Sequence, residues 1–188
     1  MALAYPWLNG KEIGFYSHKE LTDVKLFSII PFMLKTSSLC VYGDNIRSGL
    51  PGFKADRALA NDHIIQLEAH IKQAKRGLVG NEDEEDIADC CGWIMKIIVR
   101  AGLALVMEKE RAYTRDLYPA YQVFSTFYPK KERDMEKTLN YAINPFKSTE
   151  DIVRFLERFG DWMIRKGELW LEEYNPDRAR RLPITSKY

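Results

Sequence analysis

Apolar residues recur at steps of three and four from residue 55 onward, a spacing that places them on one face of an α-helix. The first such stripe comprises Ala60, Ile64, Leu67, Ile71, Ala74 and Leu78. Gly77 and Gly80 lie at its end, where glycine typically terminates a helix. The pattern predicts one amphipathic helix whose apolar stripe packs against the rest of the protein.

The stretch from Ile87 to Met107 is apolar almost all the way round, which predicts a central helix covered on every side by other elements. Lys96 and Arg100 interrupt it, so the pattern disfavours a membrane span and favours a buried helix. These cations would either extend to the end of the bundle or reach an inner cavity. Asn81, with Glu84 three residues later, predicts the N-cap of this helix.

Further helical stripes follow the central helix. Pro119 is expected to end or kink that helix, because a proline inside a helix removes a backbone donor and clashes with the preceding turn. A stripe through Tyr121 and Phe124 leads to Pro129, and a short amphipathic helix should stop near Pro145. Ser148 predicts the start of the last helix, whose inner face would carry Ile152, Phe155, Leu156, Phe159, Met163 and Trp170. Residues 55–174 therefore predict a mainly α protein, an up-and-down bundle of four to five helices.

The two ends of the chain differ from this pattern. Residues 1–54 alternate short strand and helix signals: a hairpin turn over 8–11, a capping box over 17–20 and a strand over 39–42. We expect a small N-terminal mixed α/β segment there, too short for a complete α/β domain. The arginine-bearing residues 175–188 predict an exposed tail.

Composition narrows the classes of function. The 188 residues carry a net charge of +1, which offers no support for broad binding to nucleic acid or to an anionic membrane. The three cysteines form no CxxC pair and the three histidines are scattered, so neither a zinc site nor a disulfide framework is indicated. The N-terminus does not resemble a signal peptide. We expect a cytoplasmic protein that holds no metal ion or cofactor itself.

A dense polar cluster follows the central apolar stretch, and it is the strongest candidate for a site. Carboxylates beside arginines and phenols suit a polar, phosphorylated or amine-bearing ligand. The alternative is a solvated helix end with ordinary ion pairs. The candidate ligand-binding residues are Glu108, Arg111, Thr114, Arg115, Asp116 and Tyr121.

Three segments resemble a known group of proteins. They are Cys-Val-Tyr-Gly-Asp-Asn at 40–45, Phe-Lys-Ala-Asp-Arg at 53–57 and Glu-Arg-Ala-Tyr-Thr-Arg-Asp-Leu-Tyr-Pro at 110–119. Together with Phe124 and Tyr128 they resemble the C-terminal half of bacterial nucleotidyltransferases. The likeness is to kanamycin nucleotidyltransferase and to the wider group that pairs a minimal nucleotidyltransferase with a HEPN-like helical bundle. It covers roughly residues 38–174.

The resemblance implies a function together with a missing part. In that family an N-terminal palm carries Gly-Ser followed by Asp-x-Asp, whose carboxylates hold Mg²⁺ for attack on a nucleoside triphosphate. This chain contains neither motif, and only the last pieces of such a palm would be present before residue 54. The resemblance therefore implies an acceptor-binding helical domain that is not catalytically competent alone. Mg²⁺ and a nucleoside triphosphate would enter only with a palm partner. The resemblance leaves both Glu108 and Glu110 as candidates for the family's general base, and no motif decides between them.

Two other classes of function stay open. Arg57 and His63 match an Arg-x(4–6)-His spacing found in some helical ribonucleases, which would make the chain a HEPN-like ribonuclease or a toxin-type partner. On a regular helix, however, residues six apart point to different sides. Alternatively the bundle is a non-enzymatic dimerisation module, since so aromatic a bundle would bury one face in a homodimer. In either case we expect a homodimer.

Overall fold

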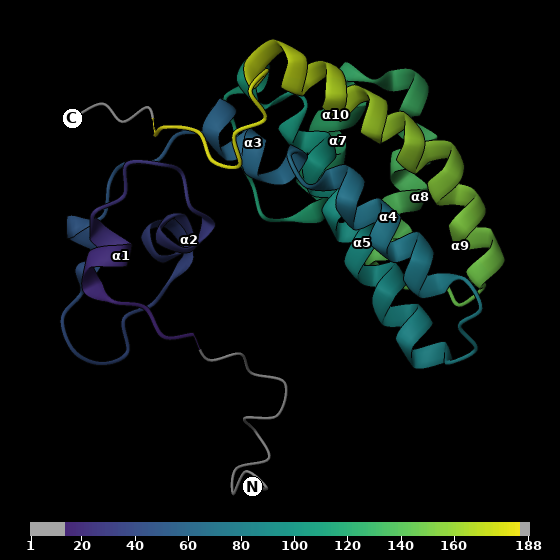
Figure 1. Ribbon diagram of the computed structural model, residues 1–188, viewed down its shortest axis with the longest axis horizontal. Coiled ribbons are helices and arrows are strands. Elements are labelled where there is room, and N and C mark those ends of the chain that lie inside the picture. The colour runs from purple at the N-terminus through teal and green to yellow at the C-terminus, as the bar shows by residue number, and fades with distance from the viewer. Residues whose placement is uncertain (1–13, 185–188) are drawn as a thin grey trace, which may run out of the picture.

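The computed structural model describes residues 14–184, and this part of the chain is mainly helical, as the hydrophobic pattern predicted. Figure 1 shows a helical bundle with a smaller N-terminal region beside it. The bundle comprises α3 (Arg57–Ile64), α4 (Leu67–Leu78), α5 (Glu84–Ala104), α6 (Met107–Glu110), α7 (Leu117–Phe127), η3 (Pro129–Lys131), α8 (Glu132–Ile143), α9 (Thr149–Phe155), η4 (Leu156–Gly160) and α10 (Asp161–Tyr174). No helix among the described residues is both long and apolar enough to cross a membrane.

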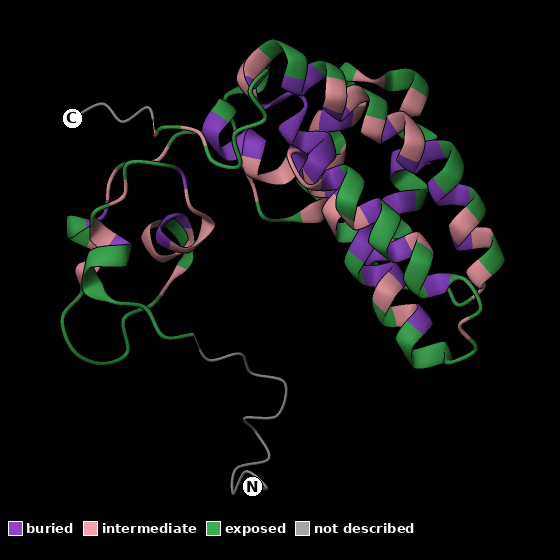
Figure 2. Cartoon of the chain, viewed as in Figure 1, coloured by how far each residue is buried: buried purple, intermediate pink, exposed green. Residues whose placement is uncertain are grey.

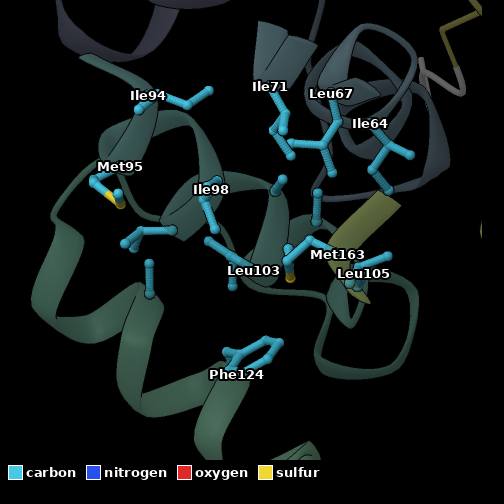
Figure 3. Packing of buried hydrophobic residues seen from close by; sticks show 14 of the residues in the cluster. Ile64, Leu67, Ile71, Ile94, Met95, Ile98, Leu103, Leu105, Phe124 and Met163 are labelled. Carbon is cyan, nitrogen blue, oxygen red and sulfur yellow. The ribbon is translucent and has the colours of Figure 1, made fainter. Parts of the chain in front are cut away.

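Helix α5 lies at the centre of the bundle, where it packs against α3, α4, α7 and α8. Its Ile94, Met95 and Ile98 are completely buried. Figure 3 shows Ile94 and Ile98 close to Ile71 and Leu67 of the α3–α4 layer. The buried residues of all these helices form one continuous core, which is the main contribution to stability in a chain of this size.

One part of the prediction for the central helix is wrong, because α5 is not covered on every side. Asp89, Trp93 and Lys96 are exposed, and their spacing of four and three residues places them on one face. Figure 2 shows such exposed positions beside buried ones along the helix. Trp93 keeps 37% of its surface accessible. This face stays exposed to water because Asp89 and Lys96 are charged, and burying a charged side chain in an apolar core is unfavourable.

The ends of α5 also differ from the prediction. Asp83, not Asn81, is the N-cap, and its Oδ1 accepts hydrogen bonds from the backbone N–H groups of Glu85 and Asp86. The helix ends at Ala104, well before Pro119. Pro119 lies in the first turn of α7, where a residue without an N–H loses no intrahelical bond.

The other helical predictions hold in position but not always in continuity. The first apolar stripe is divided between α3 and α4 by a turn at Ile65 and Gln66. Ser148 caps α9 by accepting from the backbone N–H of Asp151, as predicted. The last helix continues from α9 to α10 through the π-helical turn η4, and the six predicted inner-face residues are all buried.

The N-terminal region contains α1 (His18–Thr22), α2 (Ile29–Ser37) and η2 (Ile46–Gly49). The strand predicted over residues 39–42 is wrong: this stretch is a loop, and Leu39, Val41 and Tyr42 are more than four-fifths exposed. A strand needs a partner for its backbone groups, and no strand lies within residues 14–184. The mixed α/β character of this segment is therefore absent from its described part, and the predicted hairpin over 8–11 lies outside the described residues.

The tail beyond α10 pairs with the N-terminal region. The backbone N–H of Phe27 donates to the carbonyl of Leu182 at 2.8 Å, and that of Ile184 donates to the carbonyl of Lys25 at 3.1 Å. Leu26 and Pro183 form an isolated antiparallel bridge between them. The tail's arginines are exposed, yet its backbone is paired with residues 25–27 of the N-terminal region.

Candidate functional site

The loop between α6 and α7 lines a cavity that includes three of the candidate residues. The cavity, here called the loop cavity, has a volume of about 750 Å³ and lies between this loop, α2, α5 and residues 53–55. Its lining comprises Phe32, Thr36, Ser37, Phe53, Lys54, Ala55, Arg100, Tyr113, Thr114, Arg115 and Asp116. The volume is within the range usual for small-molecule sites.

The course of this loop is set by a left-handed backbone conformation at Arg111 and by local hydrogen bonds. The C-cap of α6 is Arg111, whose φ of 53° is in the left-handed region that non-glycine residues rarely adopt. The backbone N–H of Arg111 donates to the carbonyl of Met107 at 2.7 Å and closes the helix. Thr114 Oγ1 then accepts from the backbone N–H of Asp116 at 3.1 Å. The chain therefore turns away from the helix axis, and residues 113–116 face α2.

Tyr113 connects this loop to the core beneath it. Its ring meets the edge of Phe32 with centroids 5.0 Å apart and stacks on His63 at 6.2 Å. Burial raises the pKa of the Tyr113 hydroxyl, although Arg100 and Arg115 oppose that shift. The phenol is therefore a neutral hydrogen-bonding group at physiological pH.

Positive charge predominates in the loop cavity. Lys54, Arg100 and Arg115 supply three cations, whereas Asp116 is the one carboxylate among the lining residues. Four hydroxyls, those of Thr36, Ser37, Tyr113 and Thr114, lie in the same lining. The arrangement suits a polar ligand with negative charge, because cations and hydroxyls donate to phosphate or carboxylate oxygens.

A second cavity of about 570 Å³ adjoins the first, since Lys54 and Ala55 line both. Glu108 and Arg111 lie here, together with Arg57 and Tyr174. Its charges are more balanced, because Glu108 and Asp56 lie among the three cations. This is the part of the predicted cluster that combines a carboxylate with arginines.

The six predicted site residues therefore fall into three groups. Thr114, Arg115 and Asp116 line the loop cavity, and Glu108 and Arg111 line the second cavity. Tyr121 lies apart from both, where its hydroxyl donates to Glu132 Oε1 at 3.3 Å. The prediction treated the cluster as one helix, but the left-handed turn at Arg111 and the new helix α7 separate its members.

Sequence reasoning missed several lining residues. Thr36 and Ser37 come from α2, a helix distant in sequence that carried no site signal. Lys54 lies within the Phe-Lys-Ala-Asp-Arg segment of the resemblance, which is the signal that would have found it. For Arg100 the sequence left two alternatives open, the end of the bundle or an inner cavity, and the structure shows it half-buried in the lining of a cavity.

Arg57 and His63 do not converge. Arg57 lines the second cavity, whereas His63 lines a third one, of about 300 Å³. Burial lowers the pKa of His63 to about 4, and the nearby charge of Arg100 adds to this effect. The imidazole is therefore neutral at physiological pH. The described residues contain no group of histidines, cysteines and carboxylates arranged to hold a metal ion.

Comparison with known proteins adds no family to this description. No protein-family model, no curated protein and no solved structure matches the chain.

Proposed function

We propose that this chain is the acceptor-binding helical domain of a nucleotidyltransferase-like protein, and that the loop cavity receives the acceptor. One observation carries the proposal. Two segments on which the resemblance rests, residues 53–57 and 110–119, are more than 50 positions apart in the sequence, yet they line the same pair of adjoining cavities.

The charges of the loop cavity restrict the acceptor. Lys54, Arg100 and Arg115 would repel a polycationic aminoglycoside, and Asp116 alone does not compensate for three cations. An acceptor with hydroxyls and a phosphate or carboxylate group fits better, because each cation would form a charge-assisted hydrogen bond with it. The acceptor class that we propose is therefore a small, anionic, hydroxyl-bearing molecule.

The chain's own residues would bind and orient this acceptor. Arg100 and Arg115 would hold its anionic group, and the hydroxyl of Thr114 would contact its polar edge. The described residues offer no arrangement suited to a metal ion, so a palm partner would have to supply the Mg²⁺ and the nucleoside triphosphate. Asp116 is the carboxylate that lines the loop cavity, whereas Glu108 lines the neighbouring one.

Calorimetric titration tests the proposal directly. The protein would be titrated with a panel of sugar phosphates, with kanamycin and with Mg-ATP. We expect at least one sugar phosphate to bind and Arg115→Ala to weaken it by about tenfold or more, as loss of a charged hydrogen bond does. Arg76→Ala is the matched control, because Arg76 is exposed on α4 and lines none of the three cavities.

Three results would overturn the proposal. The first is the absence of binding by every sugar phosphate in the panel. The second is equal weakening by Arg115→Ala and Arg76→Ala, which would indicate general attraction of anions rather than a site. The third is tight binding of Mg-ATP by the protein alone, which would place a nucleotide site where the proposal has none.

The ribonuclease alternative gains no support from the geometry. Arg57 and His63 line different cavities, so they do not approach one scissile phosphate together. The homodimer stays a prediction, which light scattering tests: a mass of one chain would contradict it.

A further inference from the structure

The third cavity is separate from the proposed acceptor site except for one shared side chain. It lies between α3, α5 and the C-terminal tail. Its ionisable lining residues are Asp62, His63, His70, Arg100, Arg180 and Arg181. We call it the His63 cavity. Arg100 lines this cavity and the loop cavity as well.

One ring nitrogen of His63, a residue that lines this cavity, has no hydrogen-bond partner. This atom, Nε2, is buried. Buried polar groups in folded proteins are nearly always paired, so an unpaired one calls for an explanation. Because the pKa of the ring is lowered to about 4, the imidazole stays neutral at physiological pH and adds no charge to the cavity lining.

A buried pair of asparagines sets the position of the tail arginines. Asn61 on α3 is completely buried, and Asn175 at the end of α10 is 3% exposed. Asn175 Nδ2 donates to Asn61 Oδ1 and to the carbonyl of Ala179, both at 2.8 Å. Asn61 Nδ2 donates in turn to the carbonyls of Ala179 and Arg180 at 3.3 and 3.2 Å.

This asparagine pair holds the backbone from which Arg180 and Arg181 extend over the cavity. Burying two amides is unfavourable unless their hydrogen bonds are made, so the observed set of bonds keeps the tail in one conformation. In Figure 1 the tail passes beside α3 before it reaches the N-terminal region. The arginines are thus held at the cavity although their side chains are exposed.

The charges of the His63 cavity are unbalanced. Arg100, Arg180 and Arg181 face one carboxyl group, that of Asp62, whose pKa is raised by burial while Arg181 and Arg180 oppose the rise. None of the ion pairs formed among the described residues includes any of the three arginines. Three guanidinium groups beside one carboxylate are a strong attraction for an anion.

The surroundings limit that anion to a compact one. Further along α4 and α5, the ring of His70 meets Trp93 with centroids 5.5 Å apart, and beyond it lies a hollow lined by Asp86 and Asp89. These two carboxylates would repel the next phosphates of a polynucleotide. A cavity of about 300 Å³ also matches a small ligand.

We propose that the His63 cavity binds a single phosphate group, held by Arg100, Arg180 and Arg181 beside the ring of His63. The group is either free phosphate or the phosphoryl group of a small metabolite. Asn61 and Asn175 act as positioning residues through the tail. This site shares Arg100 with the proposed acceptor cavity, whereas Arg180 and Arg181 line only the His63 cavity of the two.

The test follows the His63 ring by NMR during titration with inorganic phosphate, and separately with ribose 5-phosphate, at constant ionic strength in chloride. We expect a saturable shift of the His63 resonances. The double variant Arg180→Ala/Arg181→Ala should weaken it by about tenfold or more. The double variant Arg76→Ala/Arg133→Ala removes the same charge from exposed positions outside the cavity and should leave the affinity unchanged.

Two further variants and a comparison of the two ligands distinguish the possible explanations of the shift. Asn175→Ala should weaken phosphate binding although Asn175 would not touch the ligand, whereas Arg115→Ala should leave it unchanged and so separates this site from the acceptor site. Tighter binding of ribose 5-phosphate than of phosphate would identify a phosphorylated metabolite, and the reverse order would identify free phosphate. The proposal is overturned by the absence of a saturable shift, by equal weakening in the charge-matched control, or by tighter binding of an RNA oligonucleotide than of either probe.

Discussion

The helical bundle and the N-terminal region are held together in different ways. In the bundle, α3 to α10 share one continuous core around α5, and its largest side chains are completely buried. In residues 14–54 the buried apolar side chains are few, and large ones such as Val41 and Tyr42 are almost fully exposed. The N-terminal region has too small a core of its own to be stable alone.

The N-terminal region is attached instead through a few specific contacts. Phe32 of α2 packs on Phe27, Phe53 and Tyr113 with centroids 5.0 to 5.7 Å apart. The backbone pairing with the tail supplies the second attachment. Because Thr36 and Ser37 of this region line the loop cavity, the proposed acceptor site depends on contacts much weaker than those of the bundle.

The largest expected effect comes from removing a large side chain of the bundle core. Phe159 is completely buried and stacks on Trp162 with centroids 5.7 Å apart. Phe159→Ala should lower the free energy of unfolding by about 3–5 kcal/mol, because it removes buried apolar surface and leaves a cavity. Urea denaturation followed by circular dichroism measures it. A change below about 1 kcal/mol would contradict the continuous core described here.

The same substitution in the other region should have a local effect. Phe32→Ala removes the ring that joins α2 to Phe53 and Tyr113, so α2 should detach while the bundle stays folded. Hydrogen exchange should then show faster exchange in residues 29–37 and nearly unchanged exchange in α5. Leu39→Ala is the control, since Leu39 is 82% exposed. Loss of protection throughout the bundle would show that the two regions unfold as one unit.

Acidification should weaken the bundle through His63. Its pKa of about 4 in the folded protein, against 6.5 ordinarily, means that the unfolded chain binds the proton more tightly. The stability due to neutral His63 is fully present above pH 6.5 and is lost as the pH falls toward 4, by about 3 kcal/mol in all. The lowered pKa of His70 acts in the same direction, and the raised pKa of Asp62 acts in the opposite one.

Comparing the wild type with His63→Gln isolates this contribution. The stability of both proteins would be measured by urea denaturation at intervals between pH 7 and pH 4. The wild type should lose more stability than the variant over that interval. Parallel curves would show that His63 is protonated as readily in the folded protein as in the unfolded chain.

The smallest expected effect is at the helix caps. Asp83→Ala removes the side chain that accepts from two backbone N–H groups at the start of α5 and should cost about 1 kcal/mol of global stability. Asp83→Asn keeps the cap and should cost less. Ser17→Ala removes the corresponding cap of α1, and should leave the unfolding of the bundle unchanged because α1 lies outside it. Equal losses of global stability in Asp83→Ala and Ser17→Ala would contradict the claim that the N-terminal region and the bundle are stabilised separately.

The sequence by itself determined the helical class, the burial of the inner face of the last helix and the cap at Ser148. These features depend on local periodicity and on hydrogen bonds within a few residues, which a sequence pattern records directly. The same reasoning identified the cluster after the central helix as polar. The segment that contains Lys54 stands out in the sequence through its resemblance to the nucleotidyltransferase segment and not through any periodic pattern.

Only the tertiary structure decided how the cluster is divided and what completes each cavity. The left-handed turn at Arg111 separates Glu108 from Thr114, and α2 closes the loop cavity from a distant part of the chain. Likewise, the hydrogen bond between Asn61 and Asn175, together with the bonds from both amides to the tail backbone, brings the tail arginines to His63 across more than 100 residues of sequence. Such contacts join residues with no common period, so their positions follow from the packing of the whole chain rather than from any local pattern.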